Sequence, residues 1–157
     1  MPNIIPRRYL LKWAVPFIGA FLAVTGSPKP ARANGSAISG TLSTHLVACA
    51  TLCTSGTISG SVSGSFDYTM AAMTATSDPN VFVLTGSFVI TNATGTLFAT
   101  DTTLWDISSG QFTDMGKFNG GTGGYNQADG KITIAGIFDI VAGTGQSTYT
   151  GHLDTQQ

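Results

Sequence analysis

The chain has 157 residues, of which 42% are hydrophobic and 10% are charged, and its formal net charge is -1. The charges are unevenly placed: residues 1–33 carry five basic side chains and no acid, whereas the rest carries two lysines, eight aspartates and no glutamate. An acidic body with so few lysines argues against nucleic acid or an anionic lipid surface as a partner.

Residues 1–33 have the three parts of a secretory signal peptide. The basic start Met1–Lys12 precedes the apolar run Trp13–Gly26, and Ala31–Ala33 supplies a small-x-small cleavage site. The apolar run is shorter than the ~20 residues that span a bilayer, so a membrane anchor is the weaker alternative. We therefore predict a signal peptide over 1–33 and one exported domain over 34–157, periplasmic or extracellular and without a membrane segment.

The paired Arg7 and Arg8, followed by Leu10, Leu11 and Lys12, resemble a twin-arginine signal. That resemblance implies a bacterial protein that folds before export. The motif is short and degenerate, so an ordinary secretion signal stays open as the alternative.

Beyond the leader, polar and apolar residues alternate at a period of two, which predicts half-buried strands. The clearest segment, Thr57–Met70, alternates without a break and predicts one long strand that bends at Gly60 and Gly64. Further strands are predicted over Ser36–Leu46, Val81–Thr91, Thr96–Ile107, Gln111–Phe118, Lys131–Ile140 and Gln146–Leu153.

Seven or eight strands at hairpin spacing, without helical periodicity, predict an all-β domain. The candidates are an antiparallel eight-stranded closed barrel and a β-sandwich. An immunoglobulin-type sandwich would place its two cysteines far apart in sequence, whereas Cys49 and Cys53 are local. This spacing disfavours that version of the sandwich.

Cys49 and Cys53 can close a small disulfide loop in an oxidising compartment, and a pair of free thiols is the alternative. A third interpretation is a metal site made by these cysteines with His45 and His152. The chain has no second Cys/His cluster, so we predict a disulfide and no metal.

The segment Gly120–Gly130 is too rich in glycine for a helix and leads into a predicted strand. Its residues resemble the Gly-Gly-Thr-Gly-x-Tyr/Phe-x-x-Ala-x-Gly segment of dirigent proteins, and similar segments occur in allene oxide cyclase-like barrels. The resemblance implies an eight-stranded antiparallel barrel with an apolar cavity that steers ring closure or coupling of a small molecule. It also implies a structural role for the glycines, which form a bend that lets Tyr125 pack against the barrel: Gly120, Gly121, Gly123 and Gly130.

This chain departs from that family in the residues that would carry chemistry. It has no glutamate to act as a cavity acid and no arginine beyond the leader. We therefore assign no catalytic residue and no cofactor.

Aromatic side chains on the inward faces of the predicted strands either fill the barrel or line a ligand pocket. The candidate ligand-binding residues are Phe66, Tyr68, Phe82, Phe88 and Phe138. Three aspartates, Asp67, Asp106 and Asp139, lie next to such aromatics in sequence. We expect Asp67 to face solvent. For Asp106 and Asp139, a solvated carboxylate and an acid at the cavity are both open.

Three functions follow as hypotheses. The first is an exported barrel that binds a small apolar or aromatic molecule, the second a cyclase or coupling guide that orients its substrate, and the third an envelope or matrix protein without a ligand. The sequence favours the first or third over an enzyme, and it leaves the oligomeric state open. A buried acid or tyrosine hydroxyl in the cavity would separate the second from the first.

Overall fold

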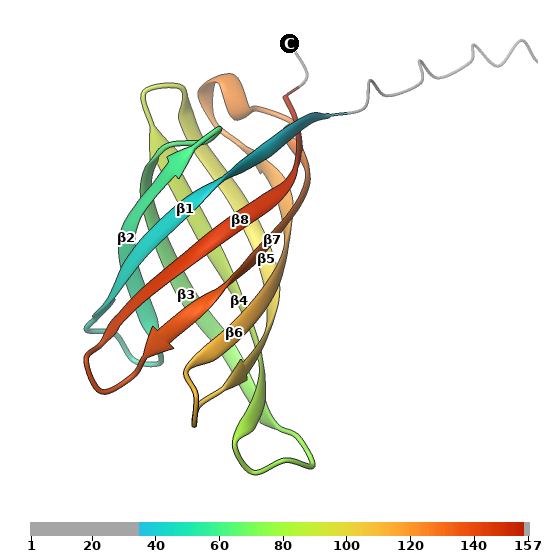
Figure 1. The fold of residues 1–157 in the computed structure, drawn as a ribbon. Helices are drawn as coiled ribbons and strands as arrows, with labels where there is room; N and C mark the ends of the chain where they lie inside the picture. The colour runs from blue at the N-terminus through green and yellow to red at the C-terminus, as the bar shows by residue number, and fades with distance from the viewer. Residues whose placement is uncertain (1–34, 156–157) are drawn as a thin grey trace, which may run out of the picture. The chain divides into compact units, whose positions relative to one another are not determined.

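The structure is a computed structural model, and it describes residues 35–155. Eight antiparallel strands follow one another around a closed barrel, in which β8 pairs with β1 (Figure 1). The predicted eight-stranded antiparallel barrel is therefore confirmed. The strands are β1 (Ser36–Val47), β2 (Cys53–Gly60), β3 (Gly64–Ala75), β4 (Val81–Asn92), β5 (Gly95–Asp106), β6 (Gln111–Gly121), β7 (Asp129–Asp139) and β8 (Thr144–Asp154).

The loops between the strands lie at the two ends of the barrel (Figure 1). We call one end the disulfide end because it contains the bond between Cys49 and Cys53, whose Cα atoms are 6.1 Å apart. This bond confirms the predicted disulfide. The loops of the disulfide end are 48–52, 76–80, 107–110 and 140–143. The opposite end has loops 61–63, 93–94 and 122–128.

The prediction of one strand over Thr57–Met70 is wrong, because the segment contains the end of β2, a turn at 61–63 and the start of β3. The turn preserves the alternation because Val62 at its tip folds inward and is only 4% exposed. The hydroxyl of Tyr149 accepts a hydrogen bond from the Val62 N–H (3.0 Å) and donates one to the Val62 carbonyl (2.9 Å). A hairpin therefore has the same sequence pattern as one long strand.

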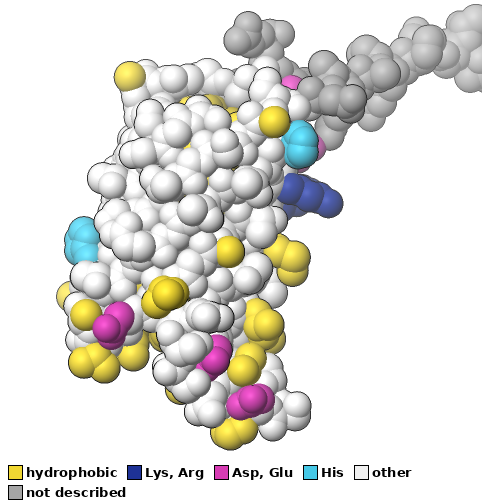
Figure 2. Space-filling view, viewed as in Figure 1, with side chains coloured by type: hydrophobic (Ala, Val, Ile, Leu, Met, Phe, Trp, Pro, Cys, Tyr) yellow, Lys and Arg dark blue, Asp and Glu magenta, His cyan; other side chains and the backbone are white. Residues whose placement is uncertain are grey.

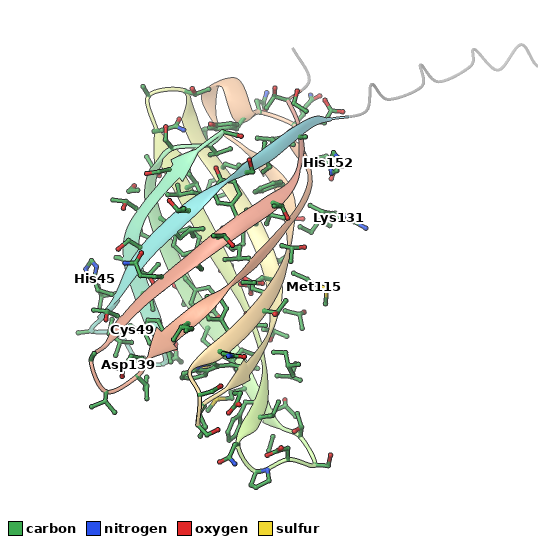
Figure 3. The ribbon with its side chains drawn as sticks, in the orientation of Figure 1. His45, Cys49, Met115, Lys131, Asp139 and His152 are labelled. Carbon is green, nitrogen blue, oxygen red and sulfur yellow. A yellow bond between two sulfur atoms is a disulfide. The ribbon has the colours of Figure 1, made fainter. Side chains whose placement is uncertain are left out.

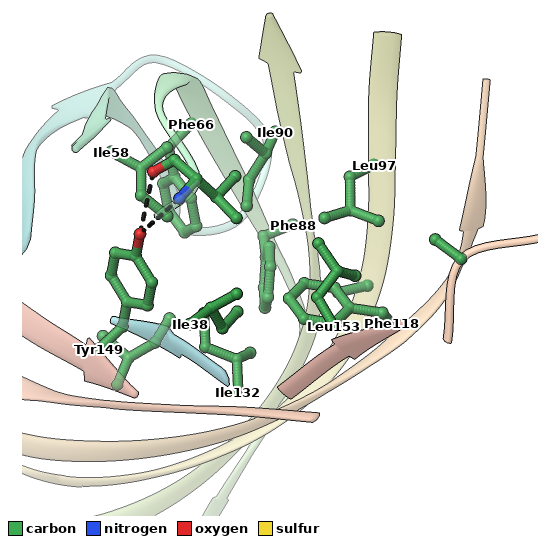
Figure 4. Packing of buried hydrophobic residues seen from close by; sticks show 14 of the residues in the cluster. Ile38, Ile58, Phe66, Phe88, Ile90, Leu97, Phe118, Ile132, Tyr149 and Leu153 are labelled. Carbon is green, nitrogen blue, oxygen red and sulfur yellow. Dashed lines mark hydrogen bonds between the residues drawn. The ribbon is translucent and has the colours of Figure 1, made fainter. Parts of the chain in front are cut away.

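Apolar side chains fill the half of the barrel near the opposite end (Figure 4). The ring of Phe88 packs against Phe66 and Phe118, with centroids 5.3 and 6.3 Å away. Interior packing of this density leaves little room for a ligand in this half. The other large, fully buried side chains of the cluster are Ile58, Ile90, Leu97, Ile132 and Tyr149.

The segment Gly120–Gly130 closes the opposite end. Gly120 and Gly123 have φ angles of 94° and 59°, in the left-handed region that favours glycine. A single 3₁₀ turn, η1 (Gly123–Tyr125), then places the ring of Tyr125 against the core, and its hydroxyl accepts a hydrogen bond from Asn92 Nδ2 at 2.9 Å. The other predicted structural glycines, Gly121 and Gly130, lie at the end of β6 and near the start of β7.

The predicted signal peptide, residues 1–33, lies outside the described residues. Within residues 35–155, no helix has the length and apolar character needed to cross a membrane.

Candidate functional site

The half of the barrel near the disulfide end contains a cavity of ≈ 90 Å³ that is partly open to solvent. Its walls come from all eight strands, because each strand directs alternate side chains inward. Aromatic and aliphatic groups make most of the lining, and hydroxyl groups and one carboxyl group interrupt it. The lining residues are Leu42, Thr44, Leu52, Thr54, Phe66, Tyr68, Leu84, Thr103, Trp105, Phe112, Asp114, Ile134, Phe138 and Ser147.

Two buried aspartates lie on the inward face of the barrel here, and one of them, Asp114, lines the cavity. Asp101 on β5 is 7% exposed, and Asp114 on β6 is 5% exposed. Thr103 lies opposite Asp114 in the ladder between these strands, so Asp101 and Asp114 are diagonal neighbours on one face. Diagonal neighbours of this kind are within reach of each other. The barrel interior thus holds a pair of carboxyl groups.

Burial raises the pKa values of both carboxyl groups, because water no longer solvates the charged forms. The pKa of Asp101 rises to about 6. The pKa of Asp114 rises to about 8, first through burial and then through repulsion from the Asp101 carboxylate. With these values the pair as a unit holds one proton at neutral pH.

Two glycines flank Asp101 in the sheet, and aromatic rings occupy the space that the glycines leave. Gly86 on β4 and Gly116 on β6 lie opposite Asp101 on its two sides. A Cβ added at Gly86 would lie 2.6 Å from the Tyr68 ring, and one added at Gly116 would lie 2.9 Å from the Phe88 ring. The ring of Tyr68 therefore lies over Gly86, and burial followed by the two carboxyl groups raises the pKa of its hydroxyl.

Several polar atoms around the cavity are buried without a hydrogen-bond partner, which is uncommon in a folded interior. A proton on Asp114 supplies Asp101 with a donor, and the Gly86 backbone is a further nearby donor that lowers the pKa of Asp101 without making a hydrogen bond of ordinary geometry. Tyr68 Oη and Trp105 Nε1 have no protein partner. Trp105, for example, is 6% exposed and packs its ring edge against Phe138, with the centroids 6.2 Å apart. In the described residues, the unpartnered atoms are Tyr68 Oη, Asp101 Oδ1 and Oδ2, Trp105 Nε1 and Asp114 Oδ1.

Of the five aromatic residues that were predicted to bind a ligand, three line the cavity and two lie elsewhere. Phe66, Tyr68 and Phe138 line the cavity. Phe88 is fully buried in the filled half, and Phe82 is half-buried beside the cluster of Leu84, Trp105 and Phe138. Ligand binding by these residues stays a prediction.

Sequence reasoning missed the carboxyl pair and Trp105 as parts of the site. The signal was present in the parity of β5, where Leu97, Asp101 and Trp105 share one face and are all buried. Asp114 shares its face with Phe118 on β6 in the same way. The aspartates singled out earlier serve elsewhere: Asp67 is exposed on β3, and Asp106 and Asp139 accept hydrogen bonds in the turns that follow them.

The disulfide loop forms part of the cavity rim. Leu52, inside the ring that the disulfide closes, lines the cavity, and its carbonyl accepts a hydrogen bond from the Met70 N–H at 3.0 Å. The side chains of His45 and His152 project outward from different parts of the barrel (Figure 3). The structure therefore does not bring the two histidines together with the bonded cysteines.

A second hollow, of ≈ 550 Å³, lies on the outer surface of β1, β7 and β8, and Lys131 and His152 are among its lining residues. Among the described residues, the unpartnered buried polar atoms belong to Tyr68, Trp105 and Asp114, which line the first cavity, and to Asp101, the diagonal neighbour of Asp114. We therefore take the smaller interior cavity as the candidate site.

Comparison of the chain with protein-family models, with curated proteins and with solved structures finds no match.

Proposed function

We propose that the protein binds a small, largely apolar molecule in the cavity at the disulfide end, with a polar group of that molecule directed at Asp114, Tyr68 and Trp105. The observation that carries the proposal is the set of buried, unpartnered polar atoms around an aromatic cavity. A barrel that needed only stability would fill this space with apolar side chains, as it does in its other half. A ligand would supply the missing partners.

The size of the cavity limits the ligand. An engineered apolar cavity of about 150 Å³ accommodates benzene, which has six non-hydrogen atoms, so the ≈ 90 Å³ here suits a molecule, or the end of one, of about four non-hydrogen atoms. Export and kinship with allene oxide cyclase or dirigent barrels are further parts of the proposal. They are supported by the leader sequence, by the segment Gly120–Gly130 and, weakly, by the disulfide.

Occupancy can be measured in two ways. Native mass spectrometry of protein purified from its own host should show a retained small molecule. In a Trp13→Phe chain, Trp105 is the sole tryptophan, and its fluorescence should change when a cavity ligand binds. No retained mass, together with a fluorescence that is unchanged by small apolar alcohols and amines, would contradict the proposal.

A second candidate function is proton transfer to a bound substrate, as in an isomerase or cyclase. The specific observation in its favour is the buried carboxyl group of Asp114 in the cavity wall, and burial raises its pKa to about 8. A carboxyl group with a pKa near the working pH is suited to general acid catalysis. Turnover of a bound molecule that is lost in Asp114→Asn would favour this candidate over binding alone. The open interior cavity weighs against a purely structural role.

A further inference from the structure

Charged side chains of the described residues lie at both ends of the barrel: Asp129, Lys131 and Asp154 are near the opposite end, whereas the hairpins of the disulfide end carry aspartates and no lysine or arginine. Asp78, Asp106 and Asp139 lie at the ends of the hairpins at the disulfide end, above the buried pair. In the face that Figure 2 shows, acidic and hydrophobic side chains gather at this end. The serine hydroxyls that follow Asp106 hold its pKa at about 2, so this carboxylate keeps its charge at any working pH. The cavity mouth is therefore electronegative.

No basic side chain of residues 35–155 balances the carboxyl pair. Lys117 and Lys131 are exposed and lie opposite each other on β6 and β7, on the outer surface. A buried carboxylate is stabilised by an opposite charge within a few ångströms, and the protein supplies none here. The missing countercharge has to be a proton or a bound cation.

The walls of the cavity suit an organic cation. Tyr68 and Trp105 line the cavity beside the carboxyl groups, together with Phe66, Phe112 and Phe138. Aromatic faces attract cations most strongly when both are removed from water. The hydroxyl groups of the lining provide acceptors for N–H donors, whereas an inorganic cation would gain little from the aromatic and aliphatic walls.

The hairpins around the mouth of the cavity carry exposed apolar side chains. Each of the four hairpins at the disulfide end carries large exposed apolar side chains, in contrast to the loops of the opposite end. A molecule with a charged group and an apolar body would contact both the rim and the interior. The exposed apolar residues of these hairpins are Leu46, Val47, Met73, Leu104, Ile107, Ile137, Ile140 and Val141.

We infer that the ligand of the cavity is a small organic cation, a protonated amine with a compact apolar body, whose ammonium group takes the place of the proton on the Asp101–Asp114 pair. This inference rests on the proposed function, since it names the class of molecule that the cavity binds. Rim aspartates steer the cation inward, and the aromatic walls enclose its apolar part. Trp105 Nε1–H remains available to donate to an oxygen on the same ligand.

Three probes with one carbon skeleton test the inference: isobutylammonium chloride, isobutanol and sodium isobutyrate. Each is titrated into the full chain at pH 8 and constant ionic strength, and binding is followed by the indole N–H signal of Trp105 in ¹H–¹⁵N NMR spectra. A Trp13→Phe spectrum assigns that signal. We expect isobutylammonium to bind at least tenfold more tightly than isobutanol, and isobutyrate not to bind.

The pH dependence and two variants sharpen the test. At pH 5.5 the carboxyl groups of Asp101 and Asp114 bind protons more fully, so the affinity for isobutylammonium should fall at least fivefold; the other titratable group at the cavity, Tyr68, stays neutral at both pH values. Asp114→Asn should remove most of the preference for the cation over isobutanol. Asp67→Asn, which removes an exposed charge from the outer face of β3, should leave the preference unchanged.

The outcomes separate the inference from the proposed function. If isobutanol binds as tightly as isobutylammonium, the inference is overturned while the proposed function stands. If none of the three probes shifts the Trp105 signal at concentrations up to tens of millimolar, both fail. If the preference for the cation survives in Asp114→Asn, the assignment of the carboxyl pair as its partner is wrong.

Discussion

At the scale of single residues, the interior holds two kinds of buried polar group. The hydroxyl of Tyr149 is paired with both backbone groups of Val62, so its burial stabilises the fold. The carboxyl groups of Asp101 and Asp114 are buried with too few partners, and their burial destabilises the fold unless a proton or ligand compensates. The two kinds predict opposite effects of mutation.

Stability should fall as pH rises from 5 to 8, because of the carboxyl pair. An aspartate titrates near 3.9 in the unfolded chain, whereas the pKa of Asp114 is about 8 in the folded protein. Between these values the folded state binds a proton that the unfolded state has lost, so the free energy of unfolding decreases with pH, by about 4 kcal/mol between pH 5 and pH 8 from Asp114 alone. Urea unfolding at several pH values measures this decrease in the free energy of unfolding.

The variant Asp114→Asn should lose more than half of that decrease and should be more stable than the parent at pH 8. Asp67→Asn is the matched control, because it makes the same chemical change on the outer surface of β3. Equal pH slopes in the parent and in Asp114→Asn would show that Asp114 ionises normally.

Tyr149→Phe should destabilise the barrel by about 2 kcal/mol, because the N–H and carbonyl of Val62 lose their partner in a buried site. Tyr125→Phe is the comparison, since its hydroxyl accepts one hydrogen bond from Asn92 at the end of the barrel and should matter less. Urea unfolding of both variants at one pH gives the difference. A Tyr149→Phe variant as stable as Tyr125→Phe would contradict this account of the turn.

At the scale of elements, the disulfide loop joins the fold to the site. Loop 48–52 contributes Leu52 to the cavity wall, and the Met70 N–H bonds to its carbonyl. A disulfide over so short a loop stabilises by about 2 kcal/mol through the unfolded state. The bond therefore secures the rim and adds to global stability.

Replacing both cysteines, as Cys49→Ala/Cys53→Ala, should lower the free energy of unfolding by about 2 kcal/mol. It should also speed hydrogen exchange of the Met70 amide, because the loop that holds its acceptor is released. The Gly124 amide donates a hydrogen bond to the Thr94 carbonyl at the opposite end. Its protection from hydrogen exchange should fall only as far as the global loss of stability requires. A Met70 amide that loses no more protection than Gly124 would show that the bond does not hold the rim.

The strand pattern was predictable from sequence because one face of each strand is buried, and the period of two records it. The turn at 61–63 was not, because Val62 points inward and continues the alternation across the hairpin. Asp101 and Asp114 could have been found by extending the same parity along β5 and β6. Their proximity depends on the register between those strands, which the alternation alone does not specify.

At the scale of the molecule, one barrel has two unequal halves. The half near the opposite end is packed with large side chains and closed by the bend that includes Gly120 and Gly123. The half near the disulfide end is less tightly packed and contains a cavity beside a buried carboxyl pair. Rigid packing in one half can support the unfavourable burial in the other, which is the usual relation between a scaffold and its site.

The most direct test is a titration of the aspartate carboxyl carbons by ¹³C NMR, without added ligand. We expect two carboxyl carbons, those of Asp101 and Asp114, to titrate together with apparent pKa values of about 6 and about 8, and both to be assigned by Asp→Asn variants. If all eight aspartates of the chain titrate below pH 5, the carboxyl pair is solvated and the account of the cavity is wrong.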